Sequence, residues 1–591
     1  MTYVDSAKKL ERLREEMQRA GVDVFLVPRD DEFLCEAIAE YSERLSWLTG
    51  FTGSAGIALI GKDKACVMSD GRYTIQLTQQ VDLETFEIAN NQEVKITEWL
   101  SNNLNQDITI GYNPKLHTPE SIHKIIEDGW VIKPVENLID KIWENQPAAP
   151  VGQVMLFDEK FAGQSSEDKI KLLQDFLVHE KCDTVLLTQT DSIQWLLNVR
   201  GYDIVQNDNQ PGNTLSPVVQ SYLILPKDGS AQWFVDSHKI SDELKEALED
   251  KVDFLNISDL EKSIQQLTGQ SIWYDPKRSS IHFKNLFEEN NVEIREGDDP
   301  VIYPRACKNK IEQDAMKNAH IRDGVAMVRF LKWFDENSTS GKLDELIVEE
   351  QLESFRKKAD EYKYPSFNTI AGFGSNGAIV HYRADKKSNQ KIENGNLLLL
   401  DSGAQYIDGT TDITRTIAVG QPTDEMVKCN TLVLKGHIAL ATAKFKKGTL
   451  GKELDEMTRA PLVAEGLNYA HGTGHGVGCY LSVHEEAASI SPRGEEAMAE
   501  GMIVSNEPGY YKKGEFGIRI ENLILCQKKD DNLYFETITL APFDKNLIDT
   551  SMLSDDEKEW VNNYHQTVFD KISPHLEVDE IEWLKHATLP I

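Results

Sequence analysis

The sequence predicts a chain of three parts: an α/β domain, a second copy of that domain, and a longer α+β domain. Three observations support this prediction. A pattern of elements repeats at a fixed offset, proline-containing segments separate the parts, and the last part does not repeat the earlier pattern. The length of 591 residues also exceeds that of one ordinary domain.

The repeat is carried by four consecutive elements. Apolar residues with helical spacing precede a short apolar strand at an offset of 160 residues: Leu10, Leu13 and Met17 before VDVFLV, and Ile170, Leu173 and Leu177 before CDTVLL. A tryptophan-centred stretch follows in each copy, SWLTGFTGSAG (46–56) and QWLLNVRGYD (194–203). Each copy then continues with a pair of strands around a turn, in 57–73 and 222–239. Four elements in the same order indicate a duplicated domain.

Proline-containing segments indicate the domain boundaries. NQPAAPVG (145–152) and EGDDPVIYPRACKNK (296–310) both read as linkers. We therefore predict domains at 1–150, 151–304 and 305–591, with a C-terminal extension from about residue 545. The third domain opens with a helix pattern at 311–334 and then mixes long helices with hairpin-like strands. The extension begins with a helix capped by Ser551 or Ser554.

Composition narrows the class of protein. The chain is 40% hydrophobic and 27% charged, and it has no apolar stretch near the ~20 residues of a membrane helix. Its N-terminus lacks the apolar core of a signal peptide. The seven cysteines are scattered without a CxxC pair, which indicates a reducing cytoplasm rather than a disulfide framework. The net charge of −34 disfavours nucleic acid as a partner, since phosphates would be repelled.

Two aspartates occupy unusual positions in the third domain. Asp401 ends the apolar strand NLLLL, and Asp412 follows in a threonine-rich strand. A hairpin turning at Asp408-Gly409 would pair Asp412 with Gln405, so both aspartates would share a face about 13 Å apart at ~3.3 Å per residue. Gly403 could allow a bend that closes this gap. For an isolated pair of aspartates, Arg415 as counter-ion is a sufficient explanation.

Further polar residues favour a binding site instead. HGTGHGVGCYLSVHEE (471–486) supplies three histidines among glycines, which let the backbone approach a ligand closely. Glu507 precedes a Pro-Gly turn, and Glu521 stands at the centre of an apolar strand, where an ion pair with Arg519 is the structural alternative. Four carboxylates with imidazole form a hard ligand set suited to two divalent ions such as Mn²⁺, with Zn²⁺ or Co²⁺ as alternatives. Such ions lie about 3.5–4 Å apart and share bridging carboxylates.

The order of four motifs resembles that of the pita-bread metallopeptidases, which include methionine aminopeptidase, prolidase and aminopeptidase P. The motifs are LDSGAQYIDGTTDITRT, HGTGHGVG, NEPGYY and GIRIEN. The duplicated N-terminal part is similar to that of three-domain cytosolic aminopeptidases P, also called Xaa-Pro aminopeptidases. The resemblance implies two creatinase-like α/β domains before an α+β pita-bread catalytic domain. It also implies a cytoplasmic homodimer that releases the first residue of peptides with N-terminal Xaa-Pro, by attack of a metal-bridging hydroxide.

The family pattern assigns metal ligands by position in this sequence. Asp401 would bind one metal alone, and Asp412 and Glu521 would bridge both metals. His475 and Glu507 would complete the second metal, and Glu507 would also help take the proton of the bridging water.

Substrate roles follow from the same resemblance. His381, in SFNTIAGFGSNGAIVHYRA (366–384), and His484 would hydrogen-bond the scissile carbonyl or pass a proton to the leaving proline nitrogen. His471 would line the pocket. Arg519 would support the bridging acid beside the substrate.

Two alternatives remain open. Prolidases share this fold and cleave only dipeptides, although they carry a single N-terminal domain. Non-catalytic relatives keep the fold without the ligands, and creatinase works without metal; the five intact ligand positions argue against both.

Overall fold

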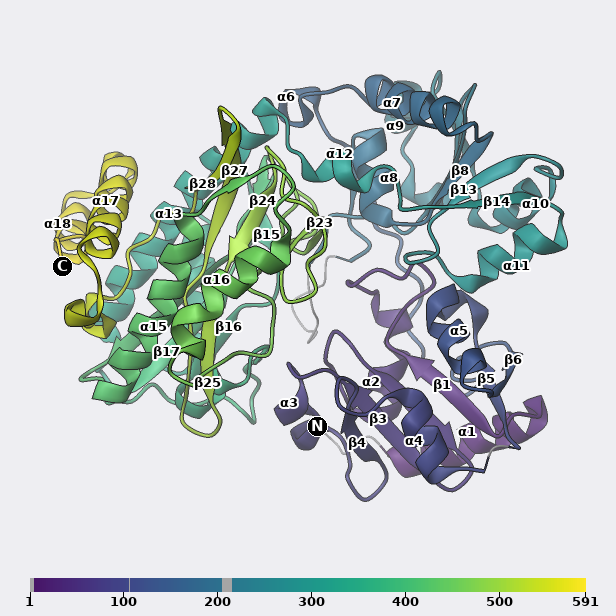
Figure 1. Ribbon diagram of the computed structural model, residues 1–591, viewed down its shortest axis with the longest axis horizontal. Helices are drawn as coiled ribbons and strands as arrows, with labels where there is room; N and C mark the ends of the chain where they lie inside the picture. Colours follow the sequence, from purple (N-terminus) through teal and green to yellow (C-terminus); the bar gives the residue numbers. More distant parts are fainter. Residues whose placement is uncertain (1–4, 106, 205–214) are drawn as a thin grey trace. The chain divides into compact units, whose positions relative to one another are not determined.

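The computed structural model describes residues 5–105, 107–204 and 215–591 (Figure 1). The chain divides into two compact units, Met1–Ile302 and Tyr303–Ile591. Within the described ranges, no helix is both long enough and apolar enough to cross a membrane. The predicted boundary between residues 150 and 151 stays a prediction.

The first unit contains two six-stranded sheets with the same topology. In the first, the order is β4 (Glu87–Asn90), β3 (Ala65–Ser69), β2 (Ile57–Gly61), β1 (Val24–Pro28), β5 (Thr109–Tyr112) and β6 (Val131–Pro134). In the second, the order is β12 (Val252–Leu255), β11 (Ala231–Phe234), β10 (Tyr222–Pro226), β8 (Thr184–Leu187), β13 (Ser271–Tyr274) and β14 (Glu293–Glu296). The pairings also agree: both central strands, β1 and β8, have an antiparallel neighbour on one side and a parallel one on the other. The predicted duplication is therefore confirmed.

Helices accompany the two sheets in matching places. The leading helices α1 (Ser6–Ala20) and α7 (Ser166–Glu180) bury the apolar residues predicted from their spacing, and the tryptophan stretches form α2 (Arg44–Thr49) and α8 (Thr190–Leu197). The other helices are α3 (Thr74–Gln80), α4 (Ile96–Asn103), α5 (Pro119–Glu127), α6 (Glu159–Ala162), α9 (Asp242–Leu248), α10 (Leu260–Gln265) and α11 (Ile281–Glu289). Only the second copy adds a two-stranded sheet, β7 (Val154–Leu156) with β9 (Val199–Gly201), among the described residues.

The second unit is built from antiparallel sheets. One contains β16 (Ile370–Phe373), β17 (Asn396–Ser402) and β20 (Ile413–Val419), and another contains β15 (Tyr362–Pro365), β18 (Ala404–Tyr406) and β19 (Gly409–Thr410). The largest has the order β21 (Lys444–Lys446), β28 (Asn532–Thr537), β27 (Asn522–Lys529), β24 (Ile503–Asn506), β22 (Gly474–Gly476) and β23 (Glu485–Ile490). A hairpin of β25 (Gly509–Lys512) and β26 (Phe516–Arg519) extends from it.

Long helices cover these sheets. They are α13 (Lys310–Asn337), α14 (Glu345–Arg356), α15 (Asp424–Ala441), α16 (Gly451–Val463), α17 (Asp555–Ile572) and α18 (Val578–Ala587), after the short α12 (Ile302–Ala306). The predicted helix at 311–334 corresponds to α13, and its first turn is closed by a capping box between Asn309 and Glu312.

The C-terminal extension is part of the core of this unit. Val561 of α17 belongs to the same buried apolar cluster as Val433 of α15 and Ile518 of β26. Both α17 and α18, yellow in Figure 1, contact α13. Of the two predicted caps for α17, the structure uses Ser554, whose hydroxyl accepts from the Glu557 amide at 3.2 Å.

Candidate metal centre

The first acidic hairpin consists of two ladder segments separated by a gap. Asp401 pairs with Thr414 in β17 and β20, and Gln405 pairs with Thr410 in β18 and β19. Gly403 lies in the gap, where a Cβ atom would come within 2.0 Å of the Thr411 carbonyl oxygen. Only glycine permits this close approach.

The turn of this hairpin differs from the prediction. Tyr406 pairs with Gly409, so Ile407 and Asp408 form the turn, one residue earlier than Asp408-Gly409. Gly409 does not have the positive φ that a type I′ turn requires. It packs instead against α13, where a Cβ atom would lie 2.9 Å from the Ala319 Cβ. Gly409 is therefore needed for helix packing rather than for the turn.

The corrected register brings the aspartates closer together. Because Asp401 pairs with Thr414, continuing the ladder sets Asp412 opposite Gly403, diagonal to Asp401 on the same face. Diagonal neighbours in an antiparallel ladder lie about 7–8 Å apart, compared with the predicted separation of about 13 Å.

The second acidic hairpin has the same design. Asn506 pairs with Asn522, and Gly509 pairs with Arg519, in two segments of one register. Glu507 and Glu521 face each other in the gap between the segments. The prediction that Glu521 is at the centre of a strand is wrong, because it lies between β26 and β27.

The gap frees the Glu521 backbone to join the two hairpins. Its amide donates to the Thr414 carbonyl at 3.1 Å, and the Thr414 hydroxyl donates to Glu521 Oε2 at 2.6 Å. The ladders are therefore interrupted at Asp412 in the first hairpin and at Glu507 and Glu521 in the second, and the freed Glu521 amide connects the two hairpins.

Three of the predicted ligands come within reach of one ion. One ligand atom each from Asp412, His475 and Glu521 lies within 4.8 Å of the others. His475 Nε2 is 3.6 Å from Asp412 Oδ2 and 3.5 Å from Glu507 Oε1. His475 Nδ1 lies 2.9 Å from the Gly476 carbonyl and donates to it, so Nε2 is the unprotonated nitrogen of the neutral ring. This is the tautomer that a metal requires.

The fourth acid, Asp401, is held by Arg519 and has one oxygen without a donor. Arg519 Nη2 donates to Asp401 Oδ2 at 2.5 Å, whereas Asp401 Oδ1 is buried without a hydrogen-bond partner. A buried carboxylate oxygen without a donor is costly. An oxygen-binding cation would satisfy it, so the residues present fit the predicted pair of divalent ions.

The pKa values reflect this crowding of acids. Burial raises the pKa of Asp412 well above its ordinary value, and the Glu521 carboxylate adds to the shift. Burial and the Asp401 charge raise the pKa of Glu521 in the same direction. Burial also raises the pKa of Glu507 to about 7, although Arg519 opposes the shift. Bound cations would remove this conflict.

A pH dependence of stability follows for the metal-free protein. Below about pH 4.5, Glu507 is protonated in both the folded and unfolded chains, and it costs nothing. As pH rises to about 7, the unfolded chain ionises first, so the folded state loses stability. We expect metal-free Glu507→Gln to gain free energy of unfolding relative to wild type over this range, measured by urea unfolding. The exposed substitution Glu515→Gln should show no such trend, and a constant difference for Glu507→Gln would contradict the assignment.

Neither Arg519 nor Arg415 pairs with the acid that the sequence suggested as its partner. Arg519 pairs with Asp401 rather than with Glu521, and it also donates to the Tyr511 hydroxyl at 2.6 Å. It is 1% exposed, so its predicted contact with substrate stays a prediction. Arg415 alternates with Thr414 along β20 and faces away from the acids, toward the carbonyls of Glu521 and Ala541.

Three of the four predicted histidines, His471, His475 and His484, contact the acids or each other. The rings of His475 and His484 meet edge to face with centroids 4.3 Å apart. His471 Nε2 is 2.8 Å from the Tyr511 hydroxyl, and its Nδ1 is 3.9 Å from Glu507 Oε2. His381 follows Val380, whose carbonyl accepts from Arg519 Nη1 at 3.4 Å.

Thr414 and Tyr511 are site residues that the sequence analysis missed. Both bind Arg519, and Thr414 also binds Glu521. Alternation from Asp412 would have indicated Thr414 as a neighbour on the same face. Tyr511 has no comparable local signal.

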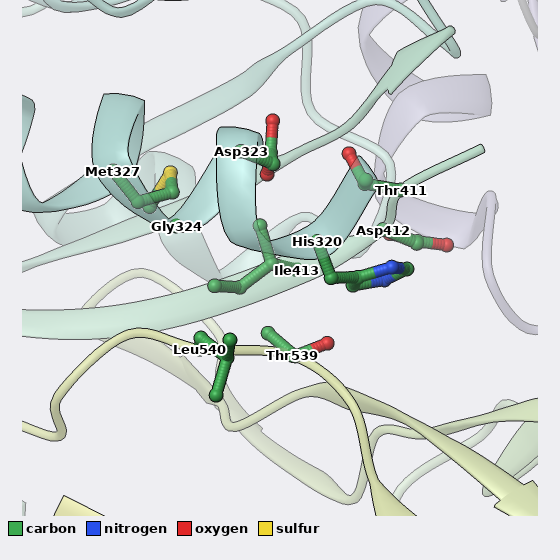
Figure 2. A pocket seen from close by; sticks show the side chains of 9 residues that line it. All are labelled: His320, Asp323, Gly324, Met327, Thr411, Asp412, Ile413, Thr539 and Leu540. Carbon is green, nitrogen blue, oxygen red and sulfur yellow. The ribbon is translucent and has the colours of Figure 1, made fainter. Parts of the chain in front are cut away.

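Behind Asp412, a small cavity separates the hairpin from α13. Figure 2 shows its lining residues, which include Asp412 and Thr411 of the hairpin and His320 and Asp323 of α13. Asp323 accepts from Arg356 Nε at 2.9 Å and from the Tyr406 hydroxyl at 3.0 Å. Through these contacts, α13 fixes Tyr406, which lies next to the turn of the first acidic hairpin.

Family models match nearly the whole chain. Metallopeptidase family M24 matches residues 314–528, the C-terminal region of peptidase M24 matches 531–591, and the creatinase/prolidase N-terminal domain matches 9–142 and 145–312 in two separate models.

Full-length relatives agree with these matches. Probable Xaa-Pro aminopeptidases P of Ajellomyces capsulatus (38% identical) and Paracoccidioides brasiliensis (37% identical) align over 100% of this chain and 100% of their own. An X-prolyl aminopeptidase from Caenorhabditis elegans, described as a cytosolic enzyme with a di-nuclear active site, is 31% identical with a TM-score of 0.93. That match covers 99% of this chain and 100% of the other. The Xaa-Pro dipeptidase from Bacillus anthracis is 27% identical with a TM-score of 0.52, over 64% of this chain and 99% of its own.

The fold and the site together define a metallopeptidase of the pita-bread class with duplicated creatinase-like N-terminal domains. Within that class, the chain belongs to the Xaa-Pro aminopeptidase P family.

Proposed function

We propose that this chain is a metal-dependent exopeptidase that releases the N-terminal residue from peptides with proline at position two. The observation that carries the proposal is the approach of Asp412, His475 and Glu521 to within reach of one ion, between two interrupted hairpins. The full-length similarity to Xaa-Pro aminopeptidases P supports the substrate class.

Five residues hold two divalent cations in this proposal. Asp401 would hold one cation, Asp412 and Glu521 would be shared by both, and His475 and Glu507 would complete the other. The unpartnered Asp401 Oδ1 and the orientation of His475 Nε2 support this allocation. When bound, the cations supply a hydroxide nucleophile at neutral pH and polarise the scissile carbonyl. The oxygen-rich set favours Mn²⁺, with Zn²⁺ or Co²⁺ as alternatives.

The remaining residues move protons and orient the peptide. Glu507 would accept the proton of the attacking water at a carboxylate oxygen. The prolyl nitrogen of the scissile bond carries no hydrogen and must be protonated as the bond breaks. His484, beside His475, and His381 hydrogen-bond the scissile carbonyl or donate that proton. His471 lines the pocket in this proposal, and its Nε2 contacts the Tyr511 hydroxyl.

The proposed location rests on a similar enzyme. The similar enzyme from Caenorhabditis elegans is described as cytosolic, which supports a cytoplasmic location for this chain. The homodimer that the resemblance implies stays a prediction.

Hydrolysis of a peptide series tests the substrate class. Peptides differing only at position two, with proline or alanine, are incubated with and without Mn²⁺. We expect cleavage of Xaa-Pro-Xaa with metal, at least about 100-fold slower cleavage of Xaa-Ala-Xaa, and none after chelation. Cleavage restricted to the dipeptide Xaa-Pro would indicate a prolidase-type dipeptidase. No cleavage of any Xaa-Pro peptide by metal-loaded protein would indicate a non-catalytic binding protein.

A further inference from the structure

Glu345, the first residue of α14, is a completely buried carboxylate with four neutral hydrogen-bond donors. Oε1 accepts from the Phe373 amide at 2.8 Å and from Asn376 Nδ2 at 3.0 Å. Oε2 accepts from the Tyr382 hydroxyl at 2.7 Å and from the Gln390 amide at 2.8 Å. The Glu345 amide in turn donates to the Gln390 carbonyl at 3.1 Å.

All four donors belong to one segment, 373–390, which connects β16 to β17 and contains His381. The residues on both sides of His381 are anchored. Tyr382 donates to Glu345, and the Val380 carbonyl accepts from Arg519 Nη1 at 3.4 Å. The backbone at His381 is therefore held between Glu345 on one side and the arginine that binds Asp401 on the other.

The segment also packs tightly on the second acidic hairpin. A Cβ atom on Gly517 of β26 would lie 1.7 Å from the Gly377 carbonyl oxygen. Such close packing leaves the segment little room to shift as a body. The conformation between Gly377 and Gln390 then depends on what Glu345 binds.

The carboxylate of Glu345 allows the segment 373–390 only one arrangement of donors. An ionised carboxylate only accepts hydrogen bonds, and a buried one is tolerated only when donors surround it. Two of its donors are backbone amides, so the chain must pass Glu345 in one arrangement. A glutamine would turn one oxygen into an NH₂ group that faces a backbone donor in either orientation, the Phe373 amide or the Gln390 amide. The segment would then have to move, and His381 with it.

We propose that Glu345 is a positioning residue for His381, acting through Tyr382 and the segment 373–390 on the histidine that meets the scissile bond. The inference rests on the proposed function, in which His381 contacts the substrate. Glu345 itself touches neither the substrate nor the proposed metal ligands.

A double-mutant cycle tests this role. The variants are Glu345→Gln, His381→Ala and the double substitution, with kcat measured on an Xaa-Pro-Xaa peptide. We expect Glu345→Gln to lower kcat about 10- to 100-fold in the wild-type background. In the His381→Ala background, the same substitution should change kcat less than about 2-fold. Metal content per chain should be the same in all four proteins. Glu350→Gln, an exposed change of equal charge on the same helix, should leave kcat unchanged.

Additive losses, with the same fold-change in both backgrounds, would overturn the proposal, as would a loss of metal in Glu345→Gln. If Glu345→Gln fails to fold, Tyr382→Phe replaces it in the cycle, because that change removes a single hydroxyl. Its effect on kcat should likewise be lost in the His381→Ala background, and additive losses would overturn the proposal. A His381→Ala enzyme with unchanged kcat would also overturn it. These outcomes leave wild-type cleavage of Xaa-Pro peptides intact, whereas inactive wild-type protein would reject the proposed function itself.

Discussion

Substitution of Glu521 with alanine is expected to lower kcat for an Xaa-Pro-Xaa peptide at least about 10³-fold. Glu521 is the proposed ligand shared by both cations, and it stands where the two acidic hairpins join through Thr414. Its loss would remove one proposed ligand from each cation, so the remaining acids would hold the cations less tightly. The metal content per chain should fall together with kcat, measured by elemental analysis after dialysis.

Two further variants control for folding and for charge. Glu521→Gln keeps the side-chain volume and should be equally inactive, while its metal-free form should unfold at no lower temperature than metal-free wild type. Glu515→Gln removes an exposed acid from the same hairpin and should keep activity within about 2-fold. Substantial turnover by Glu521→Ala with unchanged metal content would refute the ligand assignment.

Substitution of Arg415 with methionine is expected to reduce the free energy of unfolding by about 3–5 kcal/mol. The guanidinium is fully buried and donates only to neutral acceptors. These are the Pro542, Thr414, Glu521 and Ala541 carbonyls, Asn522 Oδ1 and the Tyr564 hydroxyl, at 2.7–3.1 Å. Methionine would remove the arginine donor from all six oxygens, although the Thr414 and Ala541 carbonyls would keep another donor, the Glu521 amide and the Tyr564 hydroxyl respectively. Urea unfolding of the metal-free protein measures the loss.

Matched substitutions separate hydrogen bonding from general effects of removing an arginine. Arg415→Lys keeps the charge but offers three donors without the planar fork, so an intermediate loss is expected. Arg493→Met removes an exposed arginine and should change stability by less than about 0.5 kcal/mol. A loss below about 1 kcal/mol for Arg415→Met would contradict the role assigned to this side chain.

Alternation along the strands was sufficient to predict the shared orientation of the two aspartates. Asp401 and Asp412 share a face whichever residue forms the turn, provided that the register shifts by an even number. The same rule would have excluded Arg415 as their counter-ion, because Arg415 alternates with Thr414. The duplicated α/β domain was likewise visible, since helix and strand periodicities repeat at one offset.

Other features depend on contacts that local sequence does not encode. The Asp408-Gly409 signal was misleading because Gly409 is required by α13, whose Ala319 lies 90 residues earlier in the chain. The interruption at Glu521 exists because its amide bonds to Thr414 on a different hairpin. Glu345 gave no signal at all, since an acid at the start of a helix is ordinary and its four donors lie in a later loop.

Anomalous diffraction from crystals of the Mn²⁺-loaded protein would test the central claim most directly. If the two interrupted hairpins exist to gather one histidine and four acids around a pair of cations, two peaks about 3.5–4 Å apart should appear, both in contact with Asp412 and Glu521. The absence of any peak there, or a single ion held by other residues, would contradict the account.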